Sequence, residues 1–424
     1  MTPILFFALA IVSVWASINL YHPVKNYKHG AAISFASGLV TGELAFHHIT
    51  MQAIIVAAFI LSGKVHGLLG TTGLLLFVCS WLIMGLFYFQ ANLTRAQIAK
   101  GLREGLGTSY KNQINPEFRR FFNPTINYQR ILLPHTGLRP SHVEVIRNIS
   151  YHQVNGLNLK LDIRRLRSTG HGNALNKMPV LFQIHGGAWT HRMGSKNEQA
   201  LPLMNYLCER GWICVSISYR LSPLATFPDH IIDCKRALKW TKENIARYGG
   251  NPDFIIATGG SAGGHLSALL SLTPNLPMFQ PEFEDFDSSV QGCVSFYGIY
   301  DFMDSGKLQT HSGLHELLEK SVLKASKQNN PELYQLASPI QHIHDEAPPF
   351  MLIQGDKDTL VAVSETRLFA EKLCQASNQA VVYVELPGAQ HAFDLLPSLR
   401  TELTLRGVEQ FVFWVLSQYQ IRLK

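Results

Sequence analysis

The sequence predicts an α/β fold with a mostly parallel central sheet, preceded by N-terminal transmembrane helices. From about residue 142, short apolar segments alternate with helical segments, which is typical of a parallel sheet covered on both faces. The 424-residue chain is 46% hydrophobic and only 16% charged, which indicates a membrane-embedded portion. We therefore divide it into a membrane region (1–91), a juxtamembrane amphipathic helix with a connector or lid (92–141), and the α/β domain (142–424).

The net charge of +7 is distributed unevenly along the chain. Residues 1–140 contain eleven basic and three acidic residues, whereas the remainder is close to neutral at −1. A nucleic-acid-binding domain would carry its basic patch on the folded body, so nucleic acid is not expected as a partner. The basic residues instead flank apolar segments, which indicates contact with membrane lipids.

About three transmembrane helices are predicted. The first apolar run has no basic residue before Lys25, which argues for an anchor and against a signal peptide. The second run is too long for one upright helix, and we expect one tilted or kinked helix, entering through an interfacial segment at 32–43. The third run is uncharged and the clearest of them. The predicted spans are Thr2–Leu20, 31–61 and Leu68–Phe89.

The positions of the basic residues predict the orientation. Lys25 and Lys28 lie on the same side as the basic residues after the third span, and the opposite loop offers only Lys64. The three spans make the protein an integral, multi-pass membrane protein, and the positive-inside rule places its α/β domain in the cytoplasm. The amphipathic segment 92–106 is suited to an anionic membrane surface. For residues 107–141, both disorder and a lid over a pocket stay open.

Glu43 and His47 are spaced four residues apart, on one face of a helix. We expect a hydrogen-bonded pair near the headgroups. A functional site within the membrane is the alternative, because ionisable side chains at membrane depth are costly.

Local signals divide the α/β domain into elements. Asn155-Gly156 between two alternating segments predicts a β-hairpin. Helices are expected over 195–210 and 227–248, and a final helix over 398–419 should be interrupted at Gly407. The predicted later strands are PVLFQIH, WICVSISYR, FIIATGG, VQGCVSFYG, PFMLIQG and AVVYVELPG.

A G-x-S-x-G motif lies between a predicted strand and a predicted helix. Gly259 and Gly263 permit a sharp turn that would raise the hydroxyl of Ser261 above the sheet. The motif alone is weak, but its strand–turn–helix setting favours a nucleophile. A Walker A phosphate loop is excluded because no lysine follows the glycines.

A second glycine turn follows the strand PVLFQIH. It consists of His185, Gly186, Gly187, Ala188 and Trp189. Glycines at such a position let backbone N–H groups point at one spot, where acyl transfer develops an oxyanion. We expect His185 to shape this turn rather than to transfer protons.

A serine nucleophile needs a base and an orienting carboxylate, which should follow later strands. His391 is the last histidine and follows the final predicted strand. Asp356 and Asp358 both follow PFMLIQ, and the spacing alone leaves them in competition. The order Ser, Asp, His is that of the α/β-hydrolases.

The motifs HGGAW, SYRLSP, GGSAGG, GDKDTLV and HAF together resemble the hormone-sensitive-lipase-like esterase/lipase family, the carboxylesterases of the α/β-hydrolase superfamily. The resemblance covers about residues 142–420 and implies the α/β-hydrolase fold. It implies Ser261 as nucleophile, His391 as base and Asp358, from its GxxDxxV pattern, as the partner of the histidine. It also implies an oxyanion hole formed by the backbone amides of Gly187, Ala188 and Ala262.

The sequence departs from this family at the third glycine of its HGGG motif, which is Ala188 here. An oxyanion hole needs only backbone N–H donors, which alanine also supplies, so activity is still expected. The resemblance implies hydrolysis of a small-molecule or lipid ester through an acyl-enzyme, with no metal or organic cofactor. An arylformamidase or other amidase is the alternative, because HGGxW also occurs in formamidases, and a catalytically silent binding module is a further one. The oligomeric state cannot be predicted.

Overall fold

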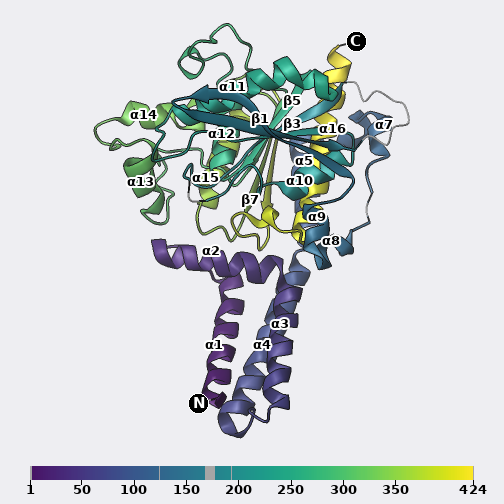
Figure 1. Cartoon of the computed structure of the whole chain (residues 1–424), viewed down its shortest axis with the longest axis vertical. Helices are drawn as coiled ribbons and strands as arrows, with labels where there is room; N and C mark the ends of the chain where they lie inside the picture. The colour runs from purple at the N-terminus through teal and green to yellow at the C-terminus, as the bar shows by residue number, and fades with distance from the viewer. Residues whose placement is uncertain (1, 124, 168–176, 192, 424) are drawn as a thin grey trace.

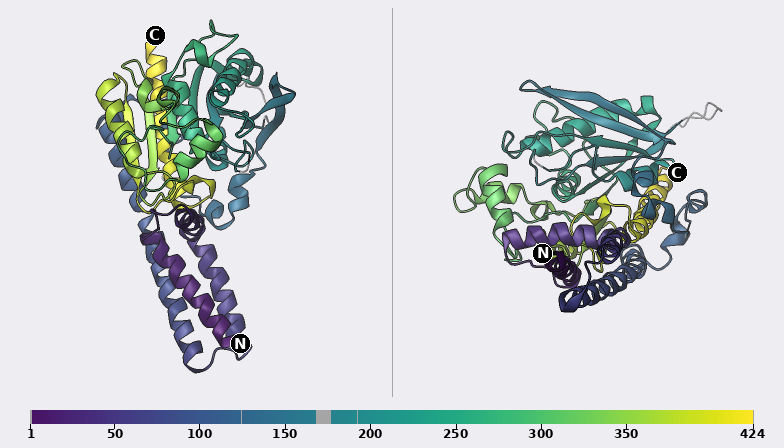
Figure 2. Two further views of the ribbon diagram at one scale, coloured as in Figure 1. Left: turned by 90° about the vertical axis from the view of Figure 1, so that its left-hand side faces the viewer. Right: turned by 60° about the horizontal axis from the view of Figure 1, so that its bottom comes forward.

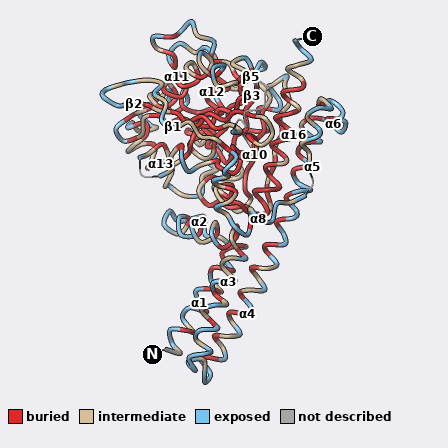
Figure 3. The backbone as a smooth tube through the Cα atoms, turned by 45° about the vertical axis from the view of Figure 1, so that its right-hand side comes forward, coloured by how far each residue is buried: buried red, intermediate tan, exposed pale blue. Residues whose placement is uncertain are grey.

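The computed structural model describes residues 2–123, 125–167, 177–191 and 193–423. Its first four helices are α1 (Thr2–Tyr21), α2 (Lys28–Glu43), α3 (Ala45–Leu61) and α4 (Gly67–Gln90). Helices α1, α3 and α4 form a stalk, and α2 lies across its upper end, beneath an α/β body (Figures 1 and 2). The interior of the body is buried, whereas the outward faces of the stalk are exposed (Figure 3) and carry large apolar side chains.

Two stretches of the stalk are long and apolar enough to cross a membrane. They are Pro3–Tyr21, with a mean hydropathy of 2.1, and Gly67–Leu106, with 2.0. Helices α2 and α3 are long and apolar enough only as a pair, and since they meet at 90°, they supply a third span only if the bent pair counts as one. The prediction that 31–61 is one helix is wrong, because the chain leaves helical geometry at Leu44 (φ −109°, ψ 34°). The expected kink is confirmed as this bend, and the interfacial placement of 32–43, which lies in α2, stays a prediction.

The predicted pairing of Glu43 with His47 is also wrong. The bend at Leu44 separates the two side chains, which then contact different partners. Glu43 forms a buried ion pair with Arg400 and accepts a hydrogen bond from Ser398 Oγ (2.6 Å). His47 Nε2 donates to the carbonyl of Leu132 (3.0 Å). Glu43 thus joins the stalk to the body.

Helix α5 (Leu93–Leu106) packs on the body. Its buried residues Ile98 and Leu102 belong to the core beside the last strand and the last helix. A Cβ at Gly101 would lie 2.5 Å from the carbonyl oxygen of Tyr383, so glycine permits this close approach. The apolar face of the predicted amphipathic helix is therefore covered by the body and is not available to a membrane surface, while its basic residues are exposed.

The connector after α5 packs on the last helix, α16 (Leu399–Arg422). The rings of Phe118 and Phe121 stack on Phe413, at centroid distances of 4.9 and 5.6 Å. These aromatic residues therefore cover a side of α16. The short helices of the connector are α6 (Tyr110–Gln113), α7 (Pro116–Arg119), α8 (Tyr128–Leu132) and α9 (Pro134–Leu138).

The body is built on one eight-stranded sheet in the order β1-β2-β4-β3-β5-β6-β7-β8. Strands β1 and β2 form an antiparallel hairpin, β2 pairs with β4 antiparallel, and the remaining pairs are parallel. The hairpin turns at Asn155 and Gly156, both at positive φ, which confirms the prediction. The strands are β1 (Val143–Val154), β2 (Leu157–Leu166), β3 (Met178–Ile184), β4 (Ile213–Ile217), β5 (Gly250–Gly260), β6 (Gly292–Phe296), β7 (Phe350–Gly355) and β8 (Val381–Leu386).

Helices cover both faces of the sheet. Alternate residues of a strand pack into hydrophobic cores on opposite faces of the sheet: Val180 of β3 lies in one core and Leu181 in the other. The parallel strands are mostly apolar because both of their faces are buried. The larger helices around the sheet are α10 (Leu201–Cys208), α11 (Asp229–Asn244), α12 (Ala262–Leu272), α15 (Val363–Ala376) and α16, and the smaller ones are α13 (Gly313–Leu317) and α14 (Pro331–Leu336). Short segments of other helix types are η1 (Ile245–Tyr248), η2 (Pro277–Phe279), η3 (Leu318–Val322), η4 (Pro339–His342) and η5 (Phe393–Leu395).

Helix α16 runs without interruption through Gly407, contrary to the prediction. A Cβ at this position would lie 2.4 Å from Cγ2 of Ile98 on α5. The glycine therefore serves a close helix–helix contact and does not end the helix.

Candidate active site

Ser261 lies in a sharp turn between β5 and α12. Its backbone has φ 58° and ψ −122°, a conformation that L-residues rarely adopt. The flanking glycines are required by space: a Cβ at Gly263 would lie 2.1 Å from the carbonyl oxygen of Ile184, and one at Gly259 would lie 2.3 Å from that of Gly263. The turn leaves Ser261 partly exposed at the carboxyl edge of the sheet, beside the N-terminus of α12.

The glycine turn after β3 lies directly beside Ser261. A Cβ at Gly186 would lie 3.2 Å from Cβ of Ser261 and 2.3 Å from the carbonyl oxygen of Gly260. Gly187 has φ 113°, and Ala188 reaches φ 54° despite its side chain. The two turns therefore meet at the nucleophile candidate.

Free backbone donors are available at this junction. Among the residues that the structure describes, none accepts a hydrogen bond from the amides of Gly187 or Ala188. Ala262 is the first residue of α12, where helix amides lack intrahelical partners. The amide of Gly186 instead donates a hydrogen bond to Oε1 of Gln199, a residue that the sequence did not single out.

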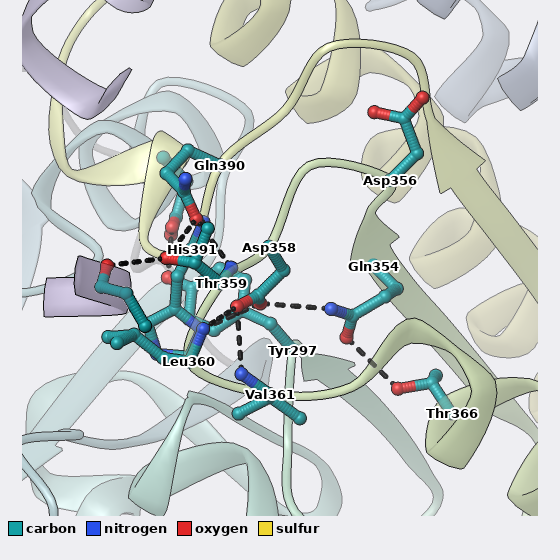
Figure 4. Close-up of polar contacts among 12 residues, drawn as sticks. Tyr297, Gln354, Asp356, Asp358, Thr359, Leu360, Val361, Thr366, Gln390 and His391 are labelled. Carbon is teal, nitrogen blue, oxygen red and sulfur yellow. Dashed lines mark hydrogen bonds and ion pairs between the residues drawn. The ribbon is translucent and has the colours of Figure 1, made fainter. Parts of the chain in front are cut away.

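Asp358 and His391 form a buried pair on the loops after β7 and β8. His391 Nδ1 donates to Asp358 Oδ2 over 2.7 Å, and the two residues are only 4% and 2% exposed (Figure 4). Gln354 Nε2 also donates to Oδ2 (2.9 Å), and the amides of Leu360 and Val361 donate to Oδ1 (2.8 and 2.9 Å). Asp358 is therefore held by four donors, with both oxygens used.

Asp356 does not reach the histidine. Its Oδ1 accepts a hydrogen bond from the amide of Gly388 (2.7 Å), and its side chain points away from His391 (Figure 4). Burial raises the pKa of this carboxyl. Of the two aspartates that competed in the sequence, the structure brings only Asp358 to His391.

Tyr297 connects the serine turn to the histidine. Its ring lies 4.6 Å from that of His391, and a Cβ at Gly260 would lie 2.7 Å from its hydroxyl oxygen. With Nδ1 of His391 used by Asp358, only Nε2 remains for a substrate or nucleophile. Among the described residues, no hydrogen bond joins Ser261 to His391. Catalytic hydrogen bonds are often long in unliganded enzymes.

Behind the histidine lies a second buried pair that the sequence did not reveal. The hydroxyl of Tyr297 donates to Asp394, and burial raises the pKa of this carboxyl to about 6. Asp394 follows His391 by three residues, which is the one signal that could have drawn attention to it.

Two other histidines near the site are structural. His185 Nδ1 donates to the carbonyl of Gly186 (2.7 Å), and burial lowers its pKa to about 4. His265 accepts a hydrogen bond from Trp189 Nε1 (3.2 Å), donates to the carbonyl of Ala337 (2.7 Å), and has its pKa lowered to about 4 by burial. In the described part of the chain, no group of three His, Cys, Asp or Glu side chains could hold a metal ion.

Known proteins resemble this chain, and one of them does so along nearly its whole length. A family model described as BD-FAE matches residues 171–373. The probable carboxylic ester hydrolase LipM of Mycobacterium tuberculosis is 41% identical, over 95% of this chain and 91% of its own. Esterase LipQ of the same organism is 46% identical, over 56% of this chain and 55% of its own. The solved structure of Thermogutta terrifontis esterase 2 phosphoramylated by tabun matches with 25% identity and a TM-score of 0.51, covering 64% of this chain and 94% of that one.

An eight-stranded, mostly parallel sheet with its candidate site at the carboxyl edge defines an α/β-hydrolase. The similarity to LipM then identifies the family: the chain belongs to the hormone-sensitive-lipase-like carboxylesterases of this superfamily, and it is a carboxylic ester hydrolase.

Proposed function

We propose that this protein hydrolyses carboxylic esters through an acyl-enzyme on Ser261, with His391 as general base and Asp358 as its orienting partner. The observation that carries the proposal is the buried 2.7 Å contact between His391 Nδ1 and Asp358 Oδ2, on loops that end beside the strained serine turn. The contact fixes the histidine tautomer so that Nε2 can accept a proton.

In the first half-reaction, His391 Nε2 takes the proton of the Ser261 hydroxyl while the oxygen attacks the ester carbonyl. The oxyanion that develops is stabilised by the amides of Gly187, Ala188 and Ala262, each worth about 3–4 kcal/mol. The imidazolium then gives its proton to the departing alcohol. In the second half-reaction, water loses its proton to His391 and attacks the acyl-enzyme. The bond to Ser261 Oγ then breaks, the imidazolium returns the proton to this oxygen, and the carboxylic acid is released.

We also propose that α1, α3 and α4 cross a membrane, with α2 at its surface and the body on the cytoplasmic side. The apolar outward faces of the stalk and the distribution of lysine and arginine support this arrangement. Tagging the N-terminus and C-terminus and measuring protease accessibility in sealed cells tests the orientation. Protection of the C-terminal tag and cleavage of the N-terminal tag are the expected results.

An ester and its matching formamide test the reaction in the purified full chain. We expect hydrolysis of the ester, because the relatives are named esterases. Ser261→Ala should abolish it, and His391→Gln should do so nearly as completely. Equal rates for the wild type and Ser261→Ala would overturn the proposal, and a faster reaction with the formamide would replace the esterase by an amidase.

A further inference from the structure

Helix α2 lies against the loops that carry the proposed catalytic pair. The carbonyl of Ala31 accepts a hydrogen bond from Thr359 Oγ1 (2.9 Å), and Thr359 directly follows Asp358. The ring of Phe35 stands edge-on to that of His391, with 6.0 Å between centroids. A helix from the stalk region thus forms part of the immediate surroundings of the active site.

Both ends of α2 are fixed to the body by charge pairs. At its start, Lys28 Nζ contacts Glu316 Oε2 over 2.8 Å. At its end, Glu43 is paired with Arg400 in a fully buried contact. The helix is therefore docked along its whole length and is a fixed part of the carboxyl edge.

The opposite face of α2 is apolar and has no partner among the described residues. Ile33 and Val40, seven residues apart, are 58% and 47% exposed, and Ala32 and Ala36 are exposed as well. Residues at this spacing share one face of a helix. The face toward the protein is made of small residues, which are Ala31, Ser34, Gly38 and Thr41.

A lipid bilayer is the occupant that fits this face. Helix α2 begins soon after α1 ends at Tyr21, and α3 starts at Ala45 directly after α2 ends, so α2 lies where the apolar stalk meets the body (Figure 2). The exposed apolar surface of the stalk is therefore continuous with that of α2. Lys25 and Lys28 contact the body, at the carbonyl of Asp356 (3.1 Å) and at Glu316 (2.8 Å), so they leave the outward face of α2 to its apolar side chains.

We propose that α2 is an interfacial helix whose exposed face lies in the bilayer surface, and that the active site takes esters whose acyl chains reside in that bilayer. The proposal rests on the function proposed for Ser261 and His391. The partly exposed serine lies at the carboxyl edge of the sheet, where α2 packs on the loops of Asp358 and His391. An ester held at headgroup depth would approach this edge beside α2, with Phe35 next to its acyl chain.

The test uses the full chain reconstituted in phosphatidylcholine vesicles with two fluorogenic esters: a water-soluble short-chain ester and a long-chain diacyl ester embedded in the same vesicles. For the wild type, the rate with the embedded ester should follow its mole fraction in the bilayer and not its bulk concentration. The double variant Ile33→Glu/Val40→Glu should lose about tenfold with the embedded ester and little with the soluble one, because charges resist burial at the interface.

Met278→Glu is the matched control. Met278 is 52% exposed, and it follows the C-terminal end of α12, at the opposite edge of the sheet from Ser261. Both rates should stay at the wild-type level in this variant. Equal rates for the double variant and the wild type with the embedded ester would overturn the proposal. Hydrolysis of the soluble ester alone by the wild type would overturn it too, whereas hydrolysis of neither ester would overturn the proposed function itself.

A second measurement decides the case in which the double variant loses both activities. Ile33→Trp adds an indole to the exposed face, and Met278→Trp adds one to the control position. In vesicles of acyl-brominated phosphatidylcholine, the added fluorescence of Ile33→Trp should be quenched and that of Met278→Trp should not. Equal quenching of the two variants would contradict the interfacial placement of α2.

Discussion

Glu43 and Arg400, 357 residues apart in the sequence, form an ion pair in which the side chains are 2% and 1% exposed. Arg400 also donates from Nε to the carbonyl of Pro387 (3.3 Å), on the loop that leads to His391. The guanidinium of Arg400 therefore contacts both the end of α2 and the loop that leads to the candidate base.

Removing one partner of this pair should destabilise the protein strongly. Glu43→Ala leaves the guanidinium of Arg400 buried without its carboxylate, which should cost about 3–5 kcal/mol of unfolding free energy. Thermal unfolding of the full chain in detergent measures the effect. Glu385→Ala is the control, because its pair with Arg367 is 26% and 58% exposed and should be worth about 1 kcal/mol or less. Equal losses in the two variants would contradict a structural role for the buried pair.

The two neighbouring aspartates should differ sharply in their effect on activity. Asp358→Asn should reduce kcat by about 10³–10⁴-fold, because Nδ1 of His391 would lose its carboxylate and with it the correct tautomer. Asp356→Asn should leave kcat within about threefold of the wild type, since Asp356 contacts Gly388 and not the histidine. Steady-state hydrolysis of a soluble ester distinguishes them, and a larger loss in Asp356→Asn would reverse the assignment.

Gly186 should not tolerate a methyl group. An added Cβ would lie 2.3 Å from the carbonyl oxygen of Gly260, a backbone atom that cannot move aside cheaply. Gly186→Ala should therefore displace the two turns relative to each other and lower kcat about 10²-fold, as small misplacements in active sites do. Gly85→Ala is the control, since a Cβ there meets nothing within 4 Å. Wild-type activity in Gly186→Ala would show that the spacing of the turns is not critical.

Glu365 should make stability depend on pH. Its Oε1 accepts hydrogen bonds from the amides of Tyr300 and Asp301 (2.6 and 3.0 Å), yet burial raises its pKa from 4.5 to about 8. Between these two pH values the folded chain holds a proton that the unfolded chain releases. The contribution of Glu365 to stability is therefore complete below pH 4.5 and falls by roughly 1 kcal/mol per pH unit up to about pH 8.

Glu365→Gln should weaken this dependence because the amide does not titrate. Melting temperatures of the full chain in detergent from acidic to alkaline pH measure it, with Glu371→Gln, an exposed position on the same helix, as the control. The wild type and the control should lose more stability than Glu365→Gln as the pH rises. Parallel curves for all three proteins would contradict the raised pKa.

Local signals predicted the parts of the site that depend on few residues. The sharp turn at Ser261 follows from glycines that touch neighbouring backbone, and the hairpin at Asn155 follows from two residues that accept positive φ. Apolar strands predicted the parallel sheet because both faces of such strands are buried. These features require no knowledge of which strands are neighbours.

The parts that were missed depend on long-range contacts. Tyr297 and Asp394 lie 97 residues apart and meet only because β6 and β8 end at the same edge of the sheet. The bend at Leu44 has no proline in the sequence to predict it, and the residue beside it, Glu43, contacts the distant Arg400. Glycine has a low helix propensity, which led to the prediction of a break at Gly407. The structure shows that Gly407 allows close contact with Ile98, about 300 residues earlier in the chain.

The central claim is that Ser261 is the nucleophile. A fluorophosphonate probe reacts covalently with activated serines, and the related esterase of Thermogutta terrifontis is described as phosphoramylated by tabun. Incubating the full chain with such a probe and locating the adduct by peptide mass spectrometry tests the claim directly. If Ser261 is the nucleophile, one adduct is expected, on the peptide that contains Ser261, and none in Ser261→Ala. An adduct on another serine, or equal labelling of Ser261→Ala, would contradict it.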